Sequence, residues 1–164
     1  MENKPKRVYD SDADEYKYVP ERENINCSKI LDNLYLGDFH ARTDPMFNAI
    51  ITLVSPPELR YISQTHPISV EHTNNVLLIP ISDNGYDEIK PHIKAGIEFI
   101  DEHIKDKKVL VHCMAGISRS PSMVIAYLMS KGMPLAEAYW FVRDKRNIIN
   151  PFSGFLKEIA EYFK

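Results

Sequence analysis

Three short apolar runs dominate the hydrophobic pattern of this chain. They are AIITLV at 49–54, VLLIPI at 76–81 and KVLVH at 108–112. Short runs that are rich in Val, Ile and Leu and apolar at consecutive positions are typical of strands buried on both faces of a parallel sheet. A further stretch, SKILDNLYLGD at 28–38, alternates apolar and polar residues instead, and it predicts a pair of short edge strands.

Helical periodicity lies between and after these runs. Isoleucines recur at spacings of four, three and four residues from Ile93 to Ile104, with Pro91 at the start, and predict a helix over 91–106. The segment PSMVIAYLMS at 121–130 is apolar almost all round, which indicates a central buried helix. Gly132 and Pro134 would end that helix.

Two more amphipathic helices are predicted by PLAEAYWFVRDKRN at 134–147 and SGFLKEIAEYF at 153–163. Strands that alternate with helices predict an α/β fold with a central, largely parallel sheet flanked by helices. The length of 164 residues suits a single domain of this kind.

The first residues differ from the rest. Residues 1–24 carry 12 charged side chains and few large aliphatic ones, so they lack the means to form a core of their own. We therefore predict a charged arm at 1–25, mobile or loosely docked, and a domain at 26–164. A short helix packed on the domain is the alternative for the arm.

Composition says more about the partners and the cellular compartment of the protein than about any reaction that it catalyses. With 20 basic and 23 acidic side chains the net charge is −3, so a broad basic surface for nucleic acid is not expected. No apolar run is long enough to span a membrane. Two cysteines are too few for a disulfide scaffold, which favours a reducing compartment, either cytoplasm or nucleus.

The stretch VLVHCMAGISRSPS at 109–122 carries the clearest chemical signal. It passes from a buried strand through a small loop into a helix, and a helix start offers unpaired N–H groups and a positive dipole end to an anion. Ala115 and Gly116 let the backbone curl into a cradle of N–H groups, Ser118 can cap the helix, and Pro121 suits its first turn. This loop is predicted to hold phosphate.

Cys113 stands at the base of the predicted cradle. Helix starts and nearby cations lower the pKa of a free thiol from about 8.5 to roughly 3.5–7.5, and the resulting thiolate is a nucleophile. Arg119, six residues further on, can clamp two phosphate oxygens with its planar fork. The alternative is that Cys113 is an inert core thiol, but this does not explain the presence of Gly116, Ser118, Arg119 and Ser120 beside it.

Displacement of an ester oxygen also needs a general acid. Asp83 follows the run 76–81, with Asp87 and Glu88 as rivals further along. We expect strands 76–81 and 108–112 to be neighbours joined by a right-handed crossover, so that their terminal loops face one crevice.

HCMAGISRS at 112–120 fits the His-Cys-x5-Arg-Ser/Thr signature of cysteine-dependent phosphatases. The chain resembles their dual-specificity subgroup, of the small atypical type, over about residues 26–163. Further matches are AYLM after the loop, LDNLYLGDFHAR, IPISD and VRDKRNIINPFSGFLKEI. The resemblance implies a cysteine-dependent phosphatase fold and hydrolysis of phosphotyrosine and phosphoserine/threonine, with no metal or other cofactor.

The resemblance also implies roles for individual residues. Cys113 would attack phosphorus, Asp83 would protonate the leaving oxygen and then activate water, and Ser120 would help the sulfur leave. His112 would tune the thiolate through the hydrogen bonds of the loop without touching substrate. The residues expected to bind the phosphate or a second phosphate on the substrate are Met114, Ala115, Gly116, Ile117, Ser118, Arg119 and Arg146.

One position departs from the family pattern. The family often has asparagine where this chain has Phe152, and that asparagine commonly braces the phosphate loop. Asn84 or Asn150 could substitute for it. Cys27 is expected to be structural or simply exposed, with a redox role toward Cys113 as an alternative. Tyr139 and Trp140 are expected to pack in or beside the core.

Three functions remain open at this point. The first is a protein phosphatase that acts on phosphorylated proteins, with kinases among the candidate partners. The second keeps the reaction but changes the substrate to a phosphoinositide or an RNA 5′-phosphate, although the loop lacks the lysines of lipid-directed relatives. The third is a phosphopeptide-binding pseudophosphatase, although the cysteine, the arginine and the acid are all present.

Overall fold

The computed structural model of the protein describes residues 6–10, 15–19, 26–68 and 75–164. A five-stranded sheet with the order β3-β4-β7-β5-β6 forms its centre. All neighbouring strands in it run parallel except β3, which pairs antiparallel with β4. The strands are β3 (Cys27–Leu31), β4 (Leu34–Gly37), β5 (Ala49–Leu53), β6 (Val76–Ile79) and β7 (Val109–His112). The predicted α/β class is confirmed.

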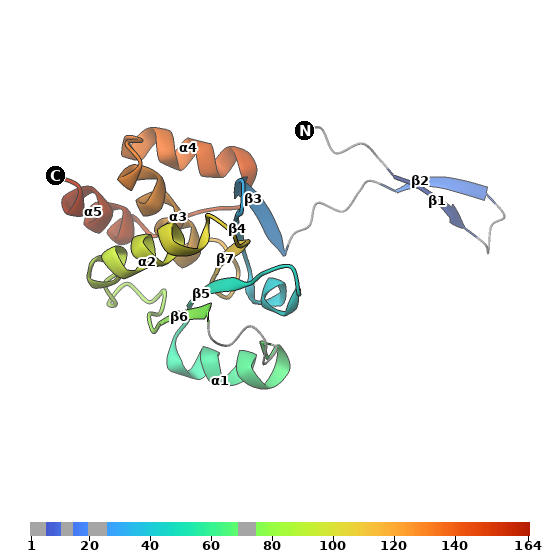
Figure 1. The fold of residues 1–164 in the computed structure, drawn as a ribbon, viewed down its shortest axis with the longest axis horizontal. Coiled ribbons are helices and arrows are strands. Elements are labelled where there is room, and N and C mark those ends of the chain that lie inside the picture. Colours follow the sequence, from blue (N-terminus) through green and yellow to red (C-terminus); the bar gives the residue numbers. More distant parts are fainter. Residues whose placement is uncertain (1–5, 11–14, 20–25, 69–74) are drawn as a thin grey trace.

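Helices cover both faces of this sheet (Figure 1). One face carries α2 (Lys90–His103), α3 (Arg119–Ser130), α4 (Leu135–Lys145) and α5 (Ser153–Tyr162). The opposite side carries the 3₁₀ helix η1 (Phe39–Thr43) and α1 (Pro56–Thr65). The helix α3 is buried at every position from Arg119 to Leu128, as its all-round apolar sequence predicted.

Successive residues of each strand point to opposite faces of the sheet, so they contribute side chains to the two sides of the core in turn. Leu36, Ile51 and Val111 pack toward α3. Ile50 and Leu110 point the other way, where they join a smaller cluster that contains Cys27, Ala41 and Phe47. The central strands are therefore buried on both faces, which is why their sequences are continuously apolar.

Two predictions about the sheet were wrong. Segment 28–38 does not supply two edge strands, because β4 lies inside the sheet between β3 and β7 and only β3 is at the edge. Strands β6 and β7 are not neighbours either: β5 lies between them, and β6 is the other edge, with Leu78 41% exposed. Parallel strands still end on one side of a sheet, so the loops after β6 and β7 do meet.

The helix α1 is an element that the sequence analysis did not identify. Ser55 precedes it and accepts a hydrogen bond from the Glu58 backbone N–H, while the Glu58 carboxylate accepts one from the Ser55 N–H. This reciprocal capping box, followed by two prolines in the first turn, fixes where the helix starts. It also fixes Glu58 at the carboxyl end of β5.

The described part of the first 25 residues is a hairpin. The strands β1 (Lys6–Asp10) and β2 (Glu15–Val19) pair antiparallel, with Lys6 opposite Val19. These residues therefore form strands and not the short helix considered as an alternative. The division of the chain at residue 25 stays a prediction, and residues 1–5, 11–14 and 20–25 lie outside the described part.

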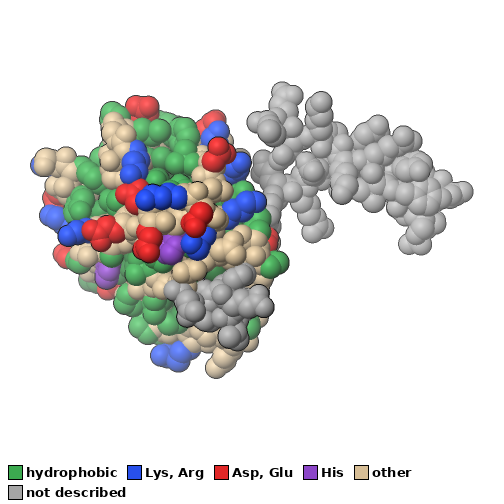
Figure 2. Space-filling view, viewed as in Figure 1, with side chains coloured by type: hydrophobic (Ala, Val, Ile, Leu, Met, Phe, Trp, Pro, Cys, Tyr) green, Lys and Arg blue, Asp and Glu red, His purple; other side chains and the backbone are tan. Residues whose placement is uncertain are grey.

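On the face of the molecule seen in Figure 2, acidic and basic side chains are interspersed rather than segregated. Within the described residues, no helix is both long enough and apolar enough to cross a lipid bilayer.

Candidate active site at the carboxyl edge of the sheet

The residues singled out by the sequence meet where four parallel strands end. β7 ends at His112, and the segment from Cys113 to Ser118, which we call the 113–118 loop, leads directly into α3. The ends of β4, β5 and β6 flank it. β4 ends at Gly37, Glu58 lies in the first turn of α1 after β5, and Asp83 lies in the loop after β6. In open α/β sheets, ligands bind at this edge.

Five successive carbonyl groups of the 113–118 loop accept hydrogen bonds from outside the loop. In a trans peptide the N–H points away from the C=O, so the following N–H groups turn toward the inside. The loop is therefore a cradle of amide donors of the kind that binds anions, as predicted. The donors to the carbonyls from Cys113 to Ile117, in order, are His112 Nδ1 (2.9 Å), Phe39 N (3.2 Å), Arg146 Nη2 (3.3 Å), Arg146 Nε (2.9 Å) and Asn150 N (2.8 Å).

Gly116 is the residue that lets the loop turn so tightly. Its φ is 67°, in the left-handed region that L side chains rarely adopt. A Cβ there would lie 2.6 Å from Arg146 Nη2 and 2.8 Å from the Gly37 carbonyl oxygen. Both the conformation and the space require glycine.

Arg146 braces the loop from beneath. Its side chain is buried, with the residue 4% exposed, and it donates to the carbonyls of Ala115 and Gly116 and to Ser28 Oγ. The expectation that it contacts a second phosphate on the substrate does not fit this position, because the guanidinium points into the fold and donates to two loop carbonyls and to the Ser28 hydroxyl. The sequence did not reveal this role, because the partners Gly116, Ala115 and Ser28 lie 30, 31 and 118 residues away.

The segment after α4 replaces the expected asparagine brace with backbone donors. Asn150 N–H donates to the Ile117 carbonyl, and Phe152 N–H donates to Ser118 Oγ at 2.9 Å. Ser118 does not cap α3 with its side chain, contrary to expectation, because its hydroxyl donates to Asp83 Oδ1 instead. Asn84 is occupied in its own turn, accepting from the N–H groups of Tyr86 and Asp87.

Cys113 lies at the floor of the cradle and is 3% exposed. Gly116 N–H donates to its sulfur at 3.3 Å, and Ser120 Oγ is 3.1 Å from the same sulfur. Hydrogen bonds aimed at sulfur stabilise negative charge on it. Of the remaining predicted loop residues, Met114 is half-buried and Ile117 is exposed.

His112 lies behind the nucleophile and is fully buried. A carbonyl only accepts, so Nδ1 carries the proton in its 2.9 Å hydrogen bond to Cys113 O, and Nε2 accepts from the Thr52 hydroxyl at 2.8 Å. Burial above all, together with the charges of Arg42 and Arg119, lowers the pKa of His112 to about 3, so the ring is neutral. It holds the loop backbone in place, in line with the indirect role expected of it.

Arg119 is held by a residue that the sequence analysis missed. Its Nη1 and Nη2 donate to the two oxygens of Glu58 at 2.7 and 3.1 Å, and Nη1 also donates to the Ile81 carbonyl at 3.0 Å. Guanidinium has five donors in a fixed fork, so Nε–H and the second Nη2–H lie on the edge not used by Glu58. The only signal for Glu58 in the sequence is the capping-box pattern SPPE at 55–58.

The Glu58–Arg119 pair predicts an acid-sensitive contribution to stability. Partial burial would raise the pKa of Glu58, but hydrogen bonds from Arg119 and Ser55 outweigh it and lower the pKa to about 2. A carboxylate with a depressed pKa stabilises the fold above pH 4.5 and loses that contribution as the pH falls toward 2. After allowance for solvent screening we expect roughly 1–2 kcal/mol.

The measurement is urea unfolding of the wild type and Glu58→Gln between pH 6 and pH 2.5. The difference in free energy of unfolding should shrink across that range, whereas Glu98→Gln, in an exposed pair with Lys94, should show less than about 0.5 kcal/mol at any pH. His112 is present in all three proteins, so its contribution to the pH dependence cancels when their free energies of unfolding are compared. A Glu58 difference that stays constant with pH would contradict the assignment.

Asp83 and its rival Asp87 have different surroundings. Asp83 is exposed, and its Oδ1 accepts from the Ser118 hydroxyl at 3.1 Å, so it reaches the 113–118 loop. Asp87 accepts from both the N–H and the hydroxyl of Ser82 at 2.7 Å, and these bonds lower its pKa. Asp87 therefore stabilises its own loop, and Asp83 is the carboxyl group in contact with the cradle.

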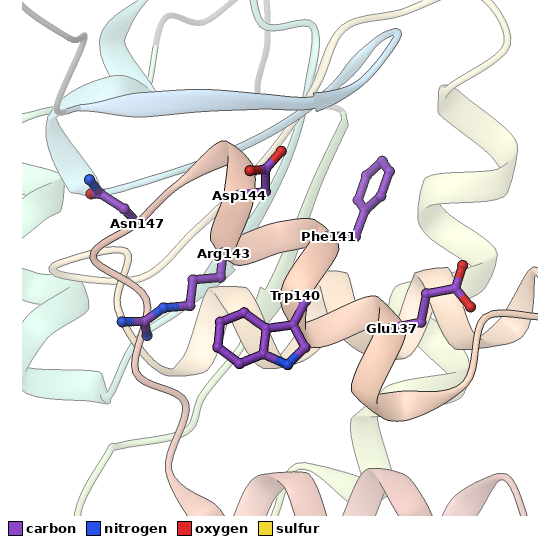
Figure 3. Close-up of a pocket in the computed structure, with 6 residues that line it drawn as sticks. All are labelled: Glu137, Trp140, Phe141, Arg143, Asp144 and Asn147. Carbon is purple, nitrogen blue, oxygen red and sulfur yellow. The ribbon is translucent and has the colours of Figure 1, made fainter.

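Other residues considered from the sequence lie elsewhere. Cys27 is a buried thiol that is not in a disulfide, and burial raises its pKa. Trp140 is not packed in the core: it is 64% exposed and, with Arg143, lines a shallow pocket of about 610 Å³ along α4 (Figure 3). Among the described residues, no group of three or more His, Cys, Asp and Glu side chains is arranged to hold a metal ion.

Comparisons with known proteins agree with this geometry. Residues 34–164 match the family model of the dual specificity phosphatase catalytic domain. Dual specificity protein phosphatase 8 of Mus musculus is 34% identical over 142 residues, which are 85% of this chain but 21% of that protein. The chain thus spans about a fifth of that relative. Putative tyrosine phosphatase 123R of Invertebrate iridescent virus 6 is 36% identical, covering 82% of this chain and 90% of that protein.

Solved structures give the same result. Human tyrosine phosphatase-like serine/threonine/tyrosine-interacting protein has a TM-score of 0.74 and 30% identity, over 85% of this chain and 96% of that one. DUSP15 has a TM-score of 0.73 and 31% identity, over 85% and 88%. With its fold, its loop and more than half of its length matched to one family model, the chain belongs to the dual specificity phosphatase family.

Proposed function

We propose that this protein is a protein phosphatase that hydrolyses phosphotyrosine and phosphoserine/threonine through a cysteinyl-phosphate intermediate. The observation that carries the proposal is the sulfur of Cys113 on the floor of an amide cradle, with Gly116 N–H and Ser120 Oγ directed at it. Membership of the dual specificity phosphatase family supports the same reaction.

In the first step the Cys113 thiolate attacks phosphorus. An S–P bond forms while the bond from phosphorus to the ester oxygen breaks, and that oxygen takes a proton from Asp83. The inward amides of the 113–118 loop and the free edge of Arg119 stabilise the charge on the three phosphoryl oxygens. Glu58 keeps the guanidinium oriented for this contact.

In the second step water attacks the phosphocysteine. The Asp83 carboxylate takes a proton from the water, the S–P bond breaks, and inorganic phosphate leaves. Ser120 donates a hydrogen bond to the departing sulfur, which its 3.1 Å separation permits. His112 stays neutral and fixes the backbone at Cys113 throughout.

Replacing Asp83 with asparagine tests the acid. Proton donation contributes about 10²–10⁴-fold, and most where the leaving group is basic. We therefore expect Asp83→Asn to slow release from phosphoserine and phosphothreonine peptides by about 10²-fold or more, but release from p-nitrophenyl phosphate by less than about tenfold. Asparagine keeps the oxygen that accepts from Ser118, so the contact itself is preserved.

Asp87→Asn is the matched control for this experiment. It removes a carboxylate from the same loop that is bonded to Ser82, so it should change stability more than leaving-group dependence. Asp83 would not be the acid if Asp83→Asn lost equal activity on alkyl and aryl phosphates. Asp87 would be the acid if Asp87→Asn instead lost much more activity on the alkyl phosphates.

Protein substrates are favoured over lipids and RNA. The side chains of the 113–118 loop carry no lysine that would meet an inositol phosphate. Relatives named as dual specificity protein phosphatases support phosphoproteins, and we include kinases among the candidates. Neither cysteine is in a disulfide, which supports work in a reducing compartment such as cytoplasm or nucleus.

The deciding experiment is a phosphate-release assay with purified protein on four substrates in parallel: phosphotyrosine peptide, phosphothreonine peptide, phosphoinositide and 5′-triphosphate RNA. Release from the peptides, blocked by vanadate, is the expected result. Release confined to lipid or RNA would reassign the substrate. Peptide binding with no turnover above that of Cys113→Ser would make this a phosphopeptide-binding protein, a class suggested by the phosphatase-like human relative.

A further inference from the structure

Phe152 is a large apolar residue whose ring has no part in the proposed reaction. It directly precedes helix α5, and its backbone N–H donates to Ser118 Oγ at 2.9 Å. The Ser118 hydroxyl in turn donates its own proton to Asp83 Oδ1 at 3.1 Å. This chain of hydrogen bonds uses only the backbone of Phe152, so it does not account for a phenyl ring at this position.

The ring of Phe152 lies against two glycines. A Cβ at Gly154, in the first turn of α5, would be 2.4 Å from Phe152 Cε1, so the ring folds back over the start of that helix. A Cβ at Gly85 would be 3.7 Å from Cζ, at the tip of the same ring. The ring also meets the buried Phe155 edge-on, with centroids 5.3 Å apart. It therefore contacts both α5 and the segment 82–87, which we call the acid loop.

The chain is tied to α5 just after the acid loop as well. Lys90, the first residue of α2, donates its backbone N–H to the Glu158 carboxylate of α5 at 3.1 Å. Gly85, in the middle of the loop, has a φ of 81°, so the chain turns where the Phe152 ring meets it. The start of α5 thus contacts the loop at its turn, and the middle of α5 holds the residue where the next helix begins.

We propose that the Phe152 ring positions the general acid, by holding the acid loop so that Asp83 lies beside the cradle. This inference rests on the proposed reaction, in which Asp83 gives its proton to the leaving oxygen. Asp83 is exposed and reaches the cradle through the Ser118 hydroxyl, so its place depends on the backbone that carries it. A displacement of about 1 Å costs up to about 10²-fold in rate, so a contact two residues away can control proton donation.

Removing the ring tests this role, because Phe152→Ala keeps the backbone N–H that donates to Ser118. We expect Phe152→Ala to slow phosphate release from a phosphothreonine peptide by about tenfold, but release from p-nitrophenyl phosphate by less than about twofold. KM should change by less than about threefold, because the cradle that binds the phosphoryl group is kept. In the Asp83→Asn background the same change should cost less than about twofold, since groups that act through one another are not additive.

Gly154→Ala tests the same contact while leaving Phe152 in the chain. Its methyl group takes the place of Phe152 Cε1, so the ring has to move away from the acid loop. Alanine is a better helix residue than glycine, so α5 itself is not weakened. We expect the same selective loss on the phosphothreonine peptide, and no further loss when Gly154→Ala is added to Phe152→Ala. In both single variants the NMR order parameters of the acid-loop amides should fall from about 0.85 toward about 0.6.

Tyr162→Ala is the matched control. Tyr162 is the last residue of α5, is 37% exposed where Phe152 is 38% exposed, and likewise meets a neighbouring ring, Phe163, edge-on. It should leave turnover and the order parameters of the acid loop unchanged. Equal losses on the two substrates in Phe152→Ala, a full further loss in the Asp83→Asn background, or unchanged order parameters would overturn the proposal.

Failure of the proposed reaction is distinguishable from failure of this inference. No turnover by the wild type on any substrate, or no leaving-group dependence in Asp83→Asn, would overturn the reaction itself. The order parameters do not depend on turnover, so they would then decide alone whether the Phe152 ring holds the acid loop. A normal Asp83→Asn result together with an unselective Phe152→Ala result would overturn only the role of Phe152.

Discussion

Replacing Cys113 with serine is expected to abolish turnover, lowering kcat by at least about 10³-fold, because a neutral hydroxyl without a base beside it is a poor nucleophile. The hydrogen bond from Gly116 N–H and the nearby Ser120 hydroxyl, which favour charge on sulfur, do not make serine ionise. Serine is nearly isosteric with cysteine, so the loop and its phosphate site should remain. The variant should therefore still bind phosphopeptide while releasing no phosphate.

The second cysteine provides the control. Cys27→Ser changes a buried thiol that is not in a disulfide and that packs with Ala41 and Phe47. It should alter stability but keep kcat within about threefold, because no reacting atom is removed. Rapid acid quenching of the wild type during turnover should trap one phosphate on sulfur. Activity retained in Cys113→Ser, or trapping that persists in that variant, would contradict covalent catalysis by this residue.

The nucleophilic loop could be predicted because its determinants are local. A strand end, small residues and a helix start lie within ten residues, and Cys113 and Arg119 are both among them. The backbone itself then dictates where the N–H groups point. The structure confirms the cradle, with five successive carbonyls turned outward.

The supports of the loop could not be predicted, because they come from distant parts of the chain. Glu58 is 61 residues from Arg119, and Arg146 is 30 residues from Gly116. Arg146 falls in the predicted helix at 134–147, and Glu58 lies in a segment for which no helix was predicted. Only the strand order, with β5 between β6 and β7, brings Glu58 to the arginine. If β6 and β7 paired directly, as expected from the sequence, β5 and the Glu58 that follows it would lie elsewhere.

Burial on helix α4 also depends on context that periodicity does not contain. The helix packs through Ala138 and Val142, which turns the large Trp140 ring outward. Arg146, one residue beyond the helix end, has extended backbone and points inward beneath the loop. Trp140 was expected in or beside the core, but the packing face of α4 places it outside. Arg146 was expected near the substrate, but the direction in which the chain leaves α4 places it beneath the loop.

Replacing Arg119 with lysine is expected to lower kcat by about 10²–10³-fold, although the charge is kept. Lysine offers one ammonium in place of a planar fork, so it cannot bind Glu58 on one edge and two phosphoryl oxygens on the other. In the present geometry Glu58 uses Nη1 and Nη2, and the Ile81 carbonyl accepts from Nη1 as well. An ammonium drawn to the Glu58 carboxylate would be withdrawn from the transition state, so kcat should fall more than KM rises.

Arg143→Lys is the matched substitution, since Arg143 donates to Tyr139 and to the Ile149 carbonyl away from the cradle, and it should change kcat by less than about threefold. A double-mutant cycle separates orientation from charge. Glu58→Gln alone should slow turnover because the fork loses its orientation, but in the Arg119→Lys background it should cost little more, since groups that act through one another are not additive. Additive losses would mean that Glu58 acts on the reaction by a route other than the guanidinium.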